Sequence, residues 1–244
     1  MTEAEECLLL PSSINGTIYE MTNLVDDQKQ IATLVVEKIN EWMTCSDPSK
    51  FKPLQLIIQG AAKTGKTYLL NVLMETLREA FAMNDVMHIV TENAEHLNKT
   101  YEQFTGIPVY EMMDKRFEMT SMQKKWFMKR CEHLLCLAFD NGAMINTRLM
   151  GTIAKILEKS AYNGCSTPDT FGNIPVVLLT NDVGMITTDF ESLWYSIQNN
   201  YKGKGMTVQG RHAFQQLSSN VMFLYGKMTS QNTNSVLVSN LQKI

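Results

Sequence analysis

The sequence predicts an α/β fold in which a mostly parallel β-sheet carries helices on both faces. Short apolar runs alternate along the chain with stretches in which apolar residues recur at helical spacing. A glycine-rich loop at residues 60–67 lies between one apolar run and one such helix. The chain has 244 residues, 44% of them hydrophobic, which suffices for one sizeable domain of this class but not comfortably for two.

The loop fits the phosphate-binding pattern G-x-x-x-x-G-K-[ST] of P-loop nucleoside triphosphatases. It reads Gly60-Ala61-Ala62-Lys63-Thr64-Gly65-Lys66-Thr67. Gly60 and Gly65 let the backbone turn tightly, so that main-chain N–H groups point at an anion. We expect Lys66 to reach the outer phosphates of ATP and the hydroxyl of Thr67 to ligate Mg²⁺. A chance match on a glycine-rich turn is the alternative, which the flanking strand and helix disfavour.

The remaining elements follow from hydrophobic periodicity. Five apolar runs are predicted to form strands, namely residues 54–59, 87–90, 134–139, 176–180 and 220–225. Helices are predicted over residues 26–42, 68–80 and 149–157. Residues 1–22 are expected to be an extended lead-in, residues 23–231 the domain, and residues 232–244 a C-terminal tail. Residues 91–118 allow no assignment beyond a turn at 105–108.

Two predicted strands end in polar residues, at the edge where a parallel sheet gathers its ligand groups. Asp140 follows residues 134–139 and is placed to hold Mg²⁺ opposite Thr67, or else to cap a strand-to-helix turn. Asn181 or Asp182 is placed to sense the γ-phosphate or position an attacking water, or else forms a turn. The candidate catalytic residues are therefore Lys66, Asp140 and Asp182, and the candidate metal ligands are Thr67 and Asp140.

A basic segment with interleaved aromatic residues runs from Lys115 to Arg130. Such a segment can follow single-stranded DNA by charge and stacking. A solvated helical face whose aromatic residues turn to the core explains the pattern as well, and is slightly favoured. The formal net charge of −3 supplies no global basic field, so any contact with a polynucleotide is expected to be local.

Cysteine usage and hydropathy bear on the compartment. The five scattered cysteines are typical of free thiols in a reducing, intracellular compartment, nuclear or cytoplasmic. Cys131, His133 and Cys136 lie close together without a second ligand cluster, which favours core packing over zinc. No apolar run reaches the length of a membrane span, so no membrane association is expected.

The order of motifs resembles the first motor domain of Pif-type superfamily-one DNA helicases, especially the helicase part of Helitron-like transposons. The resemblance covers roughly residues 22 to 231. It rests on five stretches in the family's order, namely residues 24–28, 53–67, 134–144, 172–186 and 210–224. It implies a RecA-like motor domain that binds ATP and Mg²⁺, acts on DNA and works with a second motor domain, which is expected to be absent from these 244 residues. It also implies that Gln28 contacts the adenine base.

The sequence departs from the family pattern at residues that matter for hydrolysis. The family's catalytic Glu is replaced by Asn141, an amide that cannot accept a proton from an attacking water. Met185 takes the place of a Gln of the family pattern, and Thr229 or Ser230 takes the place of its Arg. A general base is worth about 10²–10⁴ in rate and an arginine at the γ-phosphate about 10³–10⁵. We therefore expect ATP·Mg²⁺ binding with weak or absent turnover, in either a divergent helicase or a nucleotide-binding scaffold. A small-molecule kinase is the weakest alternative, because no arginine-rich lid follows the core.

Overall fold

A computed structural model describes residues 19–45, 52–92, 98–114, 116–142, 145–159, 170–181 and 205–225. Its centre is a six-stranded sheet with the order β3-β2-β4-β5-β1-β6, in which every neighbouring pair is parallel. The strands are β1 (Gln55–Gly60), β2 (Met87–Thr91), β3 (Lys99–Thr100), β4 (Cys136–Phe139), β5 (Val176–Thr180) and β6 (Val221–Leu224). The predicted α/β fold with a parallel sheet is confirmed.

Strand β1 lies between two strands from the second half of the chain. Gln55 is in register with Val176 of β5, and Ile57 with Val221 of β6. On the other side of β5, β4 continues the sheet towards β2, with Ala138 beside Ile89. Because all strands run the same way, the residues that follow β1, β4 and β5 come out at the same edge of the sheet.

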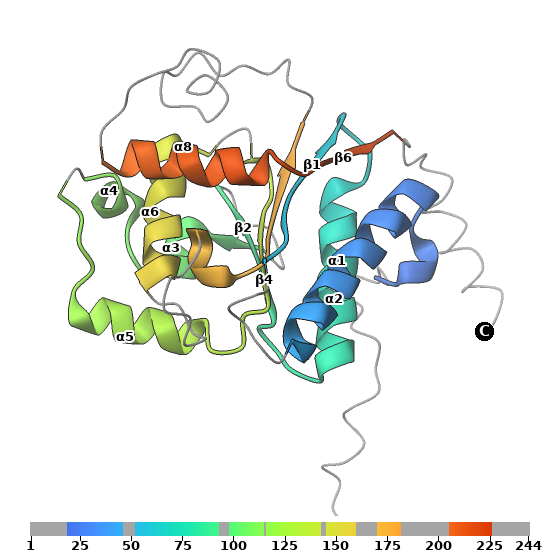
Figure 1. Cartoon of the computed structure of the whole chain (residues 1–244), viewed down its shortest axis with the longest axis horizontal. Helices are drawn as coiled ribbons and strands as arrows, with labels where there is room; N and C mark the ends of the chain where they lie inside the picture. The colour runs from blue at the N-terminus through green and yellow to red at the C-terminus, as the bar shows by residue number, and fades with distance from the viewer. Residues whose placement is uncertain are drawn as a thin grey trace, which may run out of the picture.

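Helices cover both faces of the sheet (Figure 1). One face carries α1 (Asp26–Thr44) and α2 (Lys66–Phe81), preceded by the 3₁₀ turn η2 (Met21–Asn23). The helices of the other face are α3 (Tyr101–Thr105), α4 (Val109–Met112), α5 (Ser121–Arg130), α6 (Thr147–Lys159) and α8 (Met206–Leu217), with the 3₁₀ turn η5 (Thr170–Asn173). No helix in these described ranges combines the length and the apolar character needed to cross a membrane.

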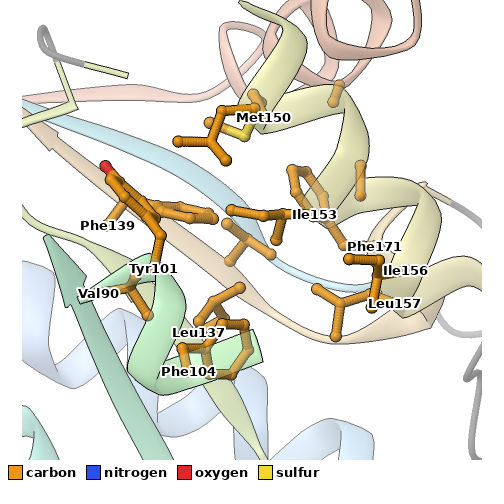
Figure 2. Close-up of a cluster of buried hydrophobic side chains, with 14 of the residues drawn as sticks. Val90, Tyr101, Phe104, Leu137, Phe139, Met150, Ile153, Ile156, Leu157 and Phe171 are labelled. Atoms are coloured by element: carbon orange, nitrogen blue, oxygen red, sulfur yellow. The ribbon is translucent and has the colours of Figure 1, made fainter. Parts of the chain in front are cut away.

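A buried hydrophobic cluster lies under each helical layer, and Figure 2 shows the one beneath α6. Phe139 from β4 and Phe171 from η5 pack with ring centroids 6.3 Å apart, next to Ile153 of α6. Alternate residues of a strand point to opposite faces, so Leu137 and Phe139 enter this cluster while Cys136 and Ala138 enter the other. This two-sided burial explains why the strands read as continuous apolar runs.

Two glycines allow α6 and α8 to cross at close range. A Cβ atom on Gly210 would lie 1.7 Å from the carbonyl oxygen of Thr147, and one on Gly151 would lie 1.9 Å from that of Met206. No side chain fits at either position unless the helices separate. The crossing therefore fixes α8 over the sheet, just before the chain enters β6.

The five predicted strands are all present: β5 has the predicted boundaries, and those of the other four differ by one or two residues. Strand β3 was not predicted, because its two residues are too few to show an alternating pattern. The helices α3 and α4, which lie within residues 91–118, were also unassigned, whereas α5 lies in the segment for which a helical face was favoured. Thr120 opens α5 with a capping box: its Oγ1 accepts from Gln123 N at 3.2 Å, and Gln123 Oε1 accepts from Thr120 N at 2.9 Å. The predicted lead-in and tail lie almost entirely outside the described residues.

Candidate nucleotide-binding site

The loop of residues 60–67 joins the end of β1 to the start of α2. Gly65 has φ 77°, in the left-handed region that glycine adopts without strain. A Cβ atom on Gly60 would lie 2.7 Å from Thr64 Oγ1 and 2.9 Å from Leu224 Cβ. The first glycine is thus required by close contact with the loop and with β6, and the second by its backbone angle.

The side chain of Lys66 folds over the loop. Its Nζ donates to the carbonyl oxygens of Gly60 at 2.6 Å and Ala61 at 2.7 Å. Thr64 Oγ1 also donates to Ala61 O, at 2.9 Å, which braces the turn. The ammonium group therefore lies at the concave centre of the loop, where a phosphate group would meet it.

Thr67 and Asp140 meet across the sheet edge, although 73 residues separate them in sequence. Thr67 Oγ1, in the first turn of α2, donates to Asp140 Oδ2 at 2.8 Å. Asp140 is held by its own backbone, because its N–H donates to the carbonyl of Val90 in β2 at 2.9 Å. A hydroxyl and a carboxylate side by side are oxygen ligands of the kind Mg²⁺ takes, and Mg²⁺ uses few protein ligands beside waters and phosphates. The pair therefore fits the predicted metal.

Asn141 follows with a left-handed backbone, at φ 59°. Asparagine tolerates this conformation better than most residues. Its N–H donates to Asp140 Oδ1 at 2.9 Å, so the second carboxylate oxygen of Asp140 is also oriented. The exposed amide side chain at this position offers no proton-accepting carboxylate.

Gln28 supports the loop from α1. Its side chain is fully buried, with 0% exposure. Nε2 donates to the carbonyl of Thr64 at 2.8 Å, and Oε1 accepts from Val25 N at 3.3 Å. In this conformation both ends of the amide bind the protein itself. The predicted contact with an adenine base would require Gln28 to change partners, and it stays a prediction.

Three further residues border the site, although the sequence did not single any of them out as a site residue. Asp27 Oδ2 accepts from Tyr225 N at 2.8 Å and so links the start of α1 to the end of β6. Tyr68, next to Thr67, packs against Tyr19 with ring centroids 5.5 Å apart. Burial raises the pKa of Tyr68 above its ordinary value. These contacts join residues far apart in the chain, and only tertiary structure could place them.

The described residues do not reach every candidate. Asn181 follows β5 and is half-buried, whereas Asp182 lies outside the described residues, as do Met185, Thr229 and Ser230. The predicted core packing is confirmed for Cys131 and Cys136, since both thiols are buried and free, but it is wrong for His133, which is exposed. Burial raises the pKa of each to about 12. No group of three or more His, Cys, Asp or Glu residues within the described ranges could hold a metal ion.

Neither a protein-family model nor a curated protein matches this sequence. Solved structures of Pif1 helicases do match its fold. A double mutant of Pif1 helicase from Bacteroides is 14% identical with a TM-score of 0.55, over 88% of this chain and 43% of that chain. A structure of two coordinating Pif1 helicases at forked double-stranded DNA is 14% identical with a TM-score of 0.54, over 82% of this chain and 43% of that chain.

A third structure, Pif1 helicase from Bacteroides in complex with ADP-AlF3 and single-stranded DNA, is 14% identical with a TM-score of 0.54. It covers 84% of this chain and 42% of that chain. The present chain therefore has a Pif1-like helicase fold of the P-loop α/β class. It spans less than half the length of the Pif1 structures that it matches.

Proposed function

We propose that this chain is a helicase-family domain that binds ATP and Mg²⁺ at residues 60–67 and takes single-stranded DNA as its partner. The observation that carries the proposal is the contact of Thr67 Oγ1 with Asp140 Oδ2 at 2.8 Å, beside the ammonium group of Lys66. Three groups suited to a metal–triphosphate complex converge here, two from the start of α2 and one from the residue that follows β4. The likeness to a Pif1 structure in complex with ADP-AlF3 and single-stranded DNA supports the same ligands.

Each group would have a definite role in binding. The main-chain N–H groups of the loop and of the first turn of α2 would bind phosphate oxygens, aided by the helix dipole. Lys66 would exchange its carbonyl partners for the outer phosphates. Thr67 and Asp140 would hold Mg²⁺, which when bound neutralises charge on the phosphates. The nucleotide base would lie near Gln28 and the pair Tyr19–Tyr68.

Hydrolysis is proposed to be weak because Asn141 stands where a carboxylate base is needed. A positioned general base contributes about 10²–10⁴ in rate, so its loss leaves binding intact and turnover slow. We further propose that a second motor domain, in another segment or another chain, completes any unit that moves on DNA. A nucleotide-binding scaffold without turnover is the second candidate, and Asn141 is the observation that favours it.

Binding is tested by calorimetry and thermal denaturation with ATP and Mg²⁺ at millimolar concentrations. At 100 times Kd, bound ligand stabilises a protein by about 2.7 kcal/mol, which raises Tm by roughly 5–11 °C in a domain of this size. Lys66→Ala should abolish the shift, and Thr67→Ala should reduce it mainly when Mg²⁺ is present. Lys52→Ala, on the loop before β1, is the matched control. Absence of both heat and thermal shift in the unmodified chain would refute the proposal.

Turnover is tested by steady-state ATPase assays with and without single-stranded DNA. DNA-stimulated hydrolysis that Lys66→Ala abolishes would support a helicase motor, and binding without hydrolysis would support a scaffold. Asn141→Glu should raise hydrolysis by at least tenfold if the missing base is the main defect. Asn141→Asp is the matched variant, because aspartate tolerates φ 59° better but its carboxylate is one methylene shorter. No gain from either variant would locate the defect elsewhere.

A further inference from the structure

We propose that the outer face of α5, with the basic pocket beside its C-terminus, is a binding site for a single-stranded polynucleotide that works without ATP. The inference deepens the proposed DNA partner, but it does not depend on nucleotide binding at residues 60–67. The site lies towards the N-terminal ends of β2 and β4, whereas the nucleotide loop follows the C-terminal end of β1. Figure 1 shows α5 along the lower margin of the α6 layer.

Helix α5 concentrates positive charge in a chain whose formal net charge is −3. Its ten residues, SMQKKWFMKR, include Lys124, Lys125, Lys129 and Arg130 and no acidic residue. All four basic side chains are exposed. A polyanion is therefore attracted locally, and the overall charge of the protein does not assist it.

The helix is anchored through one aromatic residue and presents another to solvent. Phe127 is buried and packs edge-to-face on Phe104, with centroids 5.4 Å apart. On the outer side, Trp126 is 64% exposed and Met122 is 72% exposed. At 100° per residue, Trp126 lies on the same face as Met122 and Lys129, away from Phe127. An exposed indole flanked by ammonium groups is a platform on which a base can stack.

A pocket of about 190 Å³ opens beside the last turn of α5. Its polar lining includes Lys99, Lys129, Arg130, His133 and Asp85. Asp85 is the one carboxylate in this lining, and its Oδ1 lies 3.6 Å from Lys99 Nζ. Three permanent cations against one carboxylate leave the pocket positive, which suits a phosphate group.

The cations of the pocket are held in place by defined contacts. Lys99 Nζ donates a hydrogen bond to Nδ1 of the buried His88 at 3.0 Å. Burial, and then the charge of Lys99, lower the pKa of His88 to about 4, so the ring is neutral at physiological pH. Arg130 Nη1 donates to the carbonyl of Gln103 at 2.7 Å, which fixes the guanidinium at the rim.

The spacing on α5 links the stacking platform to the pocket. Trp126 is three residues from Lys129 and four from Arg130, so all three side chains are neighbours on the helix surface. A base stacked on Trp126 therefore places an adjoining phosphate within reach of the pocket. An acidic protein segment would satisfy the charges, but it would leave the exposed indole without a planar partner.

The test is the binding of a fluorescein-labelled thymidine oligonucleotide to the 244-residue chain, followed by anisotropy without added nucleotide triphosphate. Trp126→Ala should weaken binding by about 5- to 100-fold, and Trp126→Phe, which keeps a stacking ring, by much less. Lys129→Ala should weaken binding and reduce the slope of log K against log salt by about 0.7. Lys29→Ala, an exposed lysine on the opposite helical layer, is the matched control.

Three outcomes would overturn the inference. The first is that Trp126→Ala binds the oligonucleotide as tightly as Lys29→Ala does. The second is equal affinity for duplex and single strands. The third is tighter binding of a labelled acidic peptide than of the oligonucleotide. A uridine oligonucleotide that binds as well as the thymidine one would support it, because charge and stacking do not read the sugar. Lys66→Ala should bind the oligonucleotide normally, so failure of this site and failure of the nucleotide site are distinguishable. Circular dichroism checks that each variant is folded.

Discussion

Replacing Gln28 with alanine separates two roles that this residue can have, bracing the phosphate loop or recognising the adenine base. The side chain makes two hydrogen bonds, to Thr64 O at 2.8 Å and from Val25 N at 3.3 Å. Leaving the buried Thr64 carbonyl without a donor costs about 1–3 kcal/mol, and the partly exposed Val25 N–H costs less. We expect a loss of about 2 kcal/mol in unfolding free energy, or roughly 4–8 °C in Tm.

The functional assay compares ATP with inorganic tripolyphosphate, each with Mg²⁺, by calorimetry. If Gln28 acts by bracing the loop, Gln28→Ala weakens both ligands by the same factor, because both use the loop and only ATP has a base. Gln28→Glu is the matched variant. It keeps an acceptor for Val25 N but points a carboxylate oxygen at Thr64 O, so it should destabilise at least as much as alanine. A loss for ATP at least tenfold larger than for tripolyphosphate, about 1.4 kcal/mol, would refute the bracing role.

Two further predictions concern stability. The folded-state pKa of His88, about 4, lies below its ordinary 6.5, so its stabilisation is present above pH 6.5 and is lost as pH falls towards 4. Between pH 6.5 and 4, the unfolding free energy of the wild type should fall by about 3 kcal/mol relative to that of His88→Gln, as measured by urea denaturation. Parallel pH profiles of the two proteins would contradict this. Gly210→Ala gains about 1 kcal/mol in helix propensity but places a methyl group 1.7 Å from the Thr147 carbonyl. Overpacking typically costs about 1–3 kcal/mol, and more for so short a contact. Calorimetry of Gly210→Ala should therefore show a lower Tm. An unchanged or higher Tm would mean that α6 and α8 can separate freely.

The basic segment illustrates how far a pattern can be resolved from sequence. The interpretation of residues 115–130 as a helical face with its aromatic residues in the core holds only in part, because Phe127 turns to the core while Trp126 stays exposed. Contact of this segment with DNA stays a prediction. Neighbouring residues on a helix differ by 100° in direction, so periodicity indicates that the aromatic residues diverge. It does not indicate which of them meets the core, since that depends on Phe104 and His88, which lie 20 or more residues earlier.

The nucleotide loop and the strand pattern were accessible from sequence alone, since both depend on short-range order. A phosphate-binding loop is specified by glycines and a lysine within eight residues, and buried parallel strands appear as continuous apolar runs. The tertiary structure decided what depends on strand order. The sequence predicts Asp140 opposite Thr67, and the two side chains are in contact. Only the tertiary structure turned Gln28 inward onto Thr64 and brought Lys99 to the end of α5. Such contacts are fixed by packing between distant segments, and the residues involved carry no local signal of their partners.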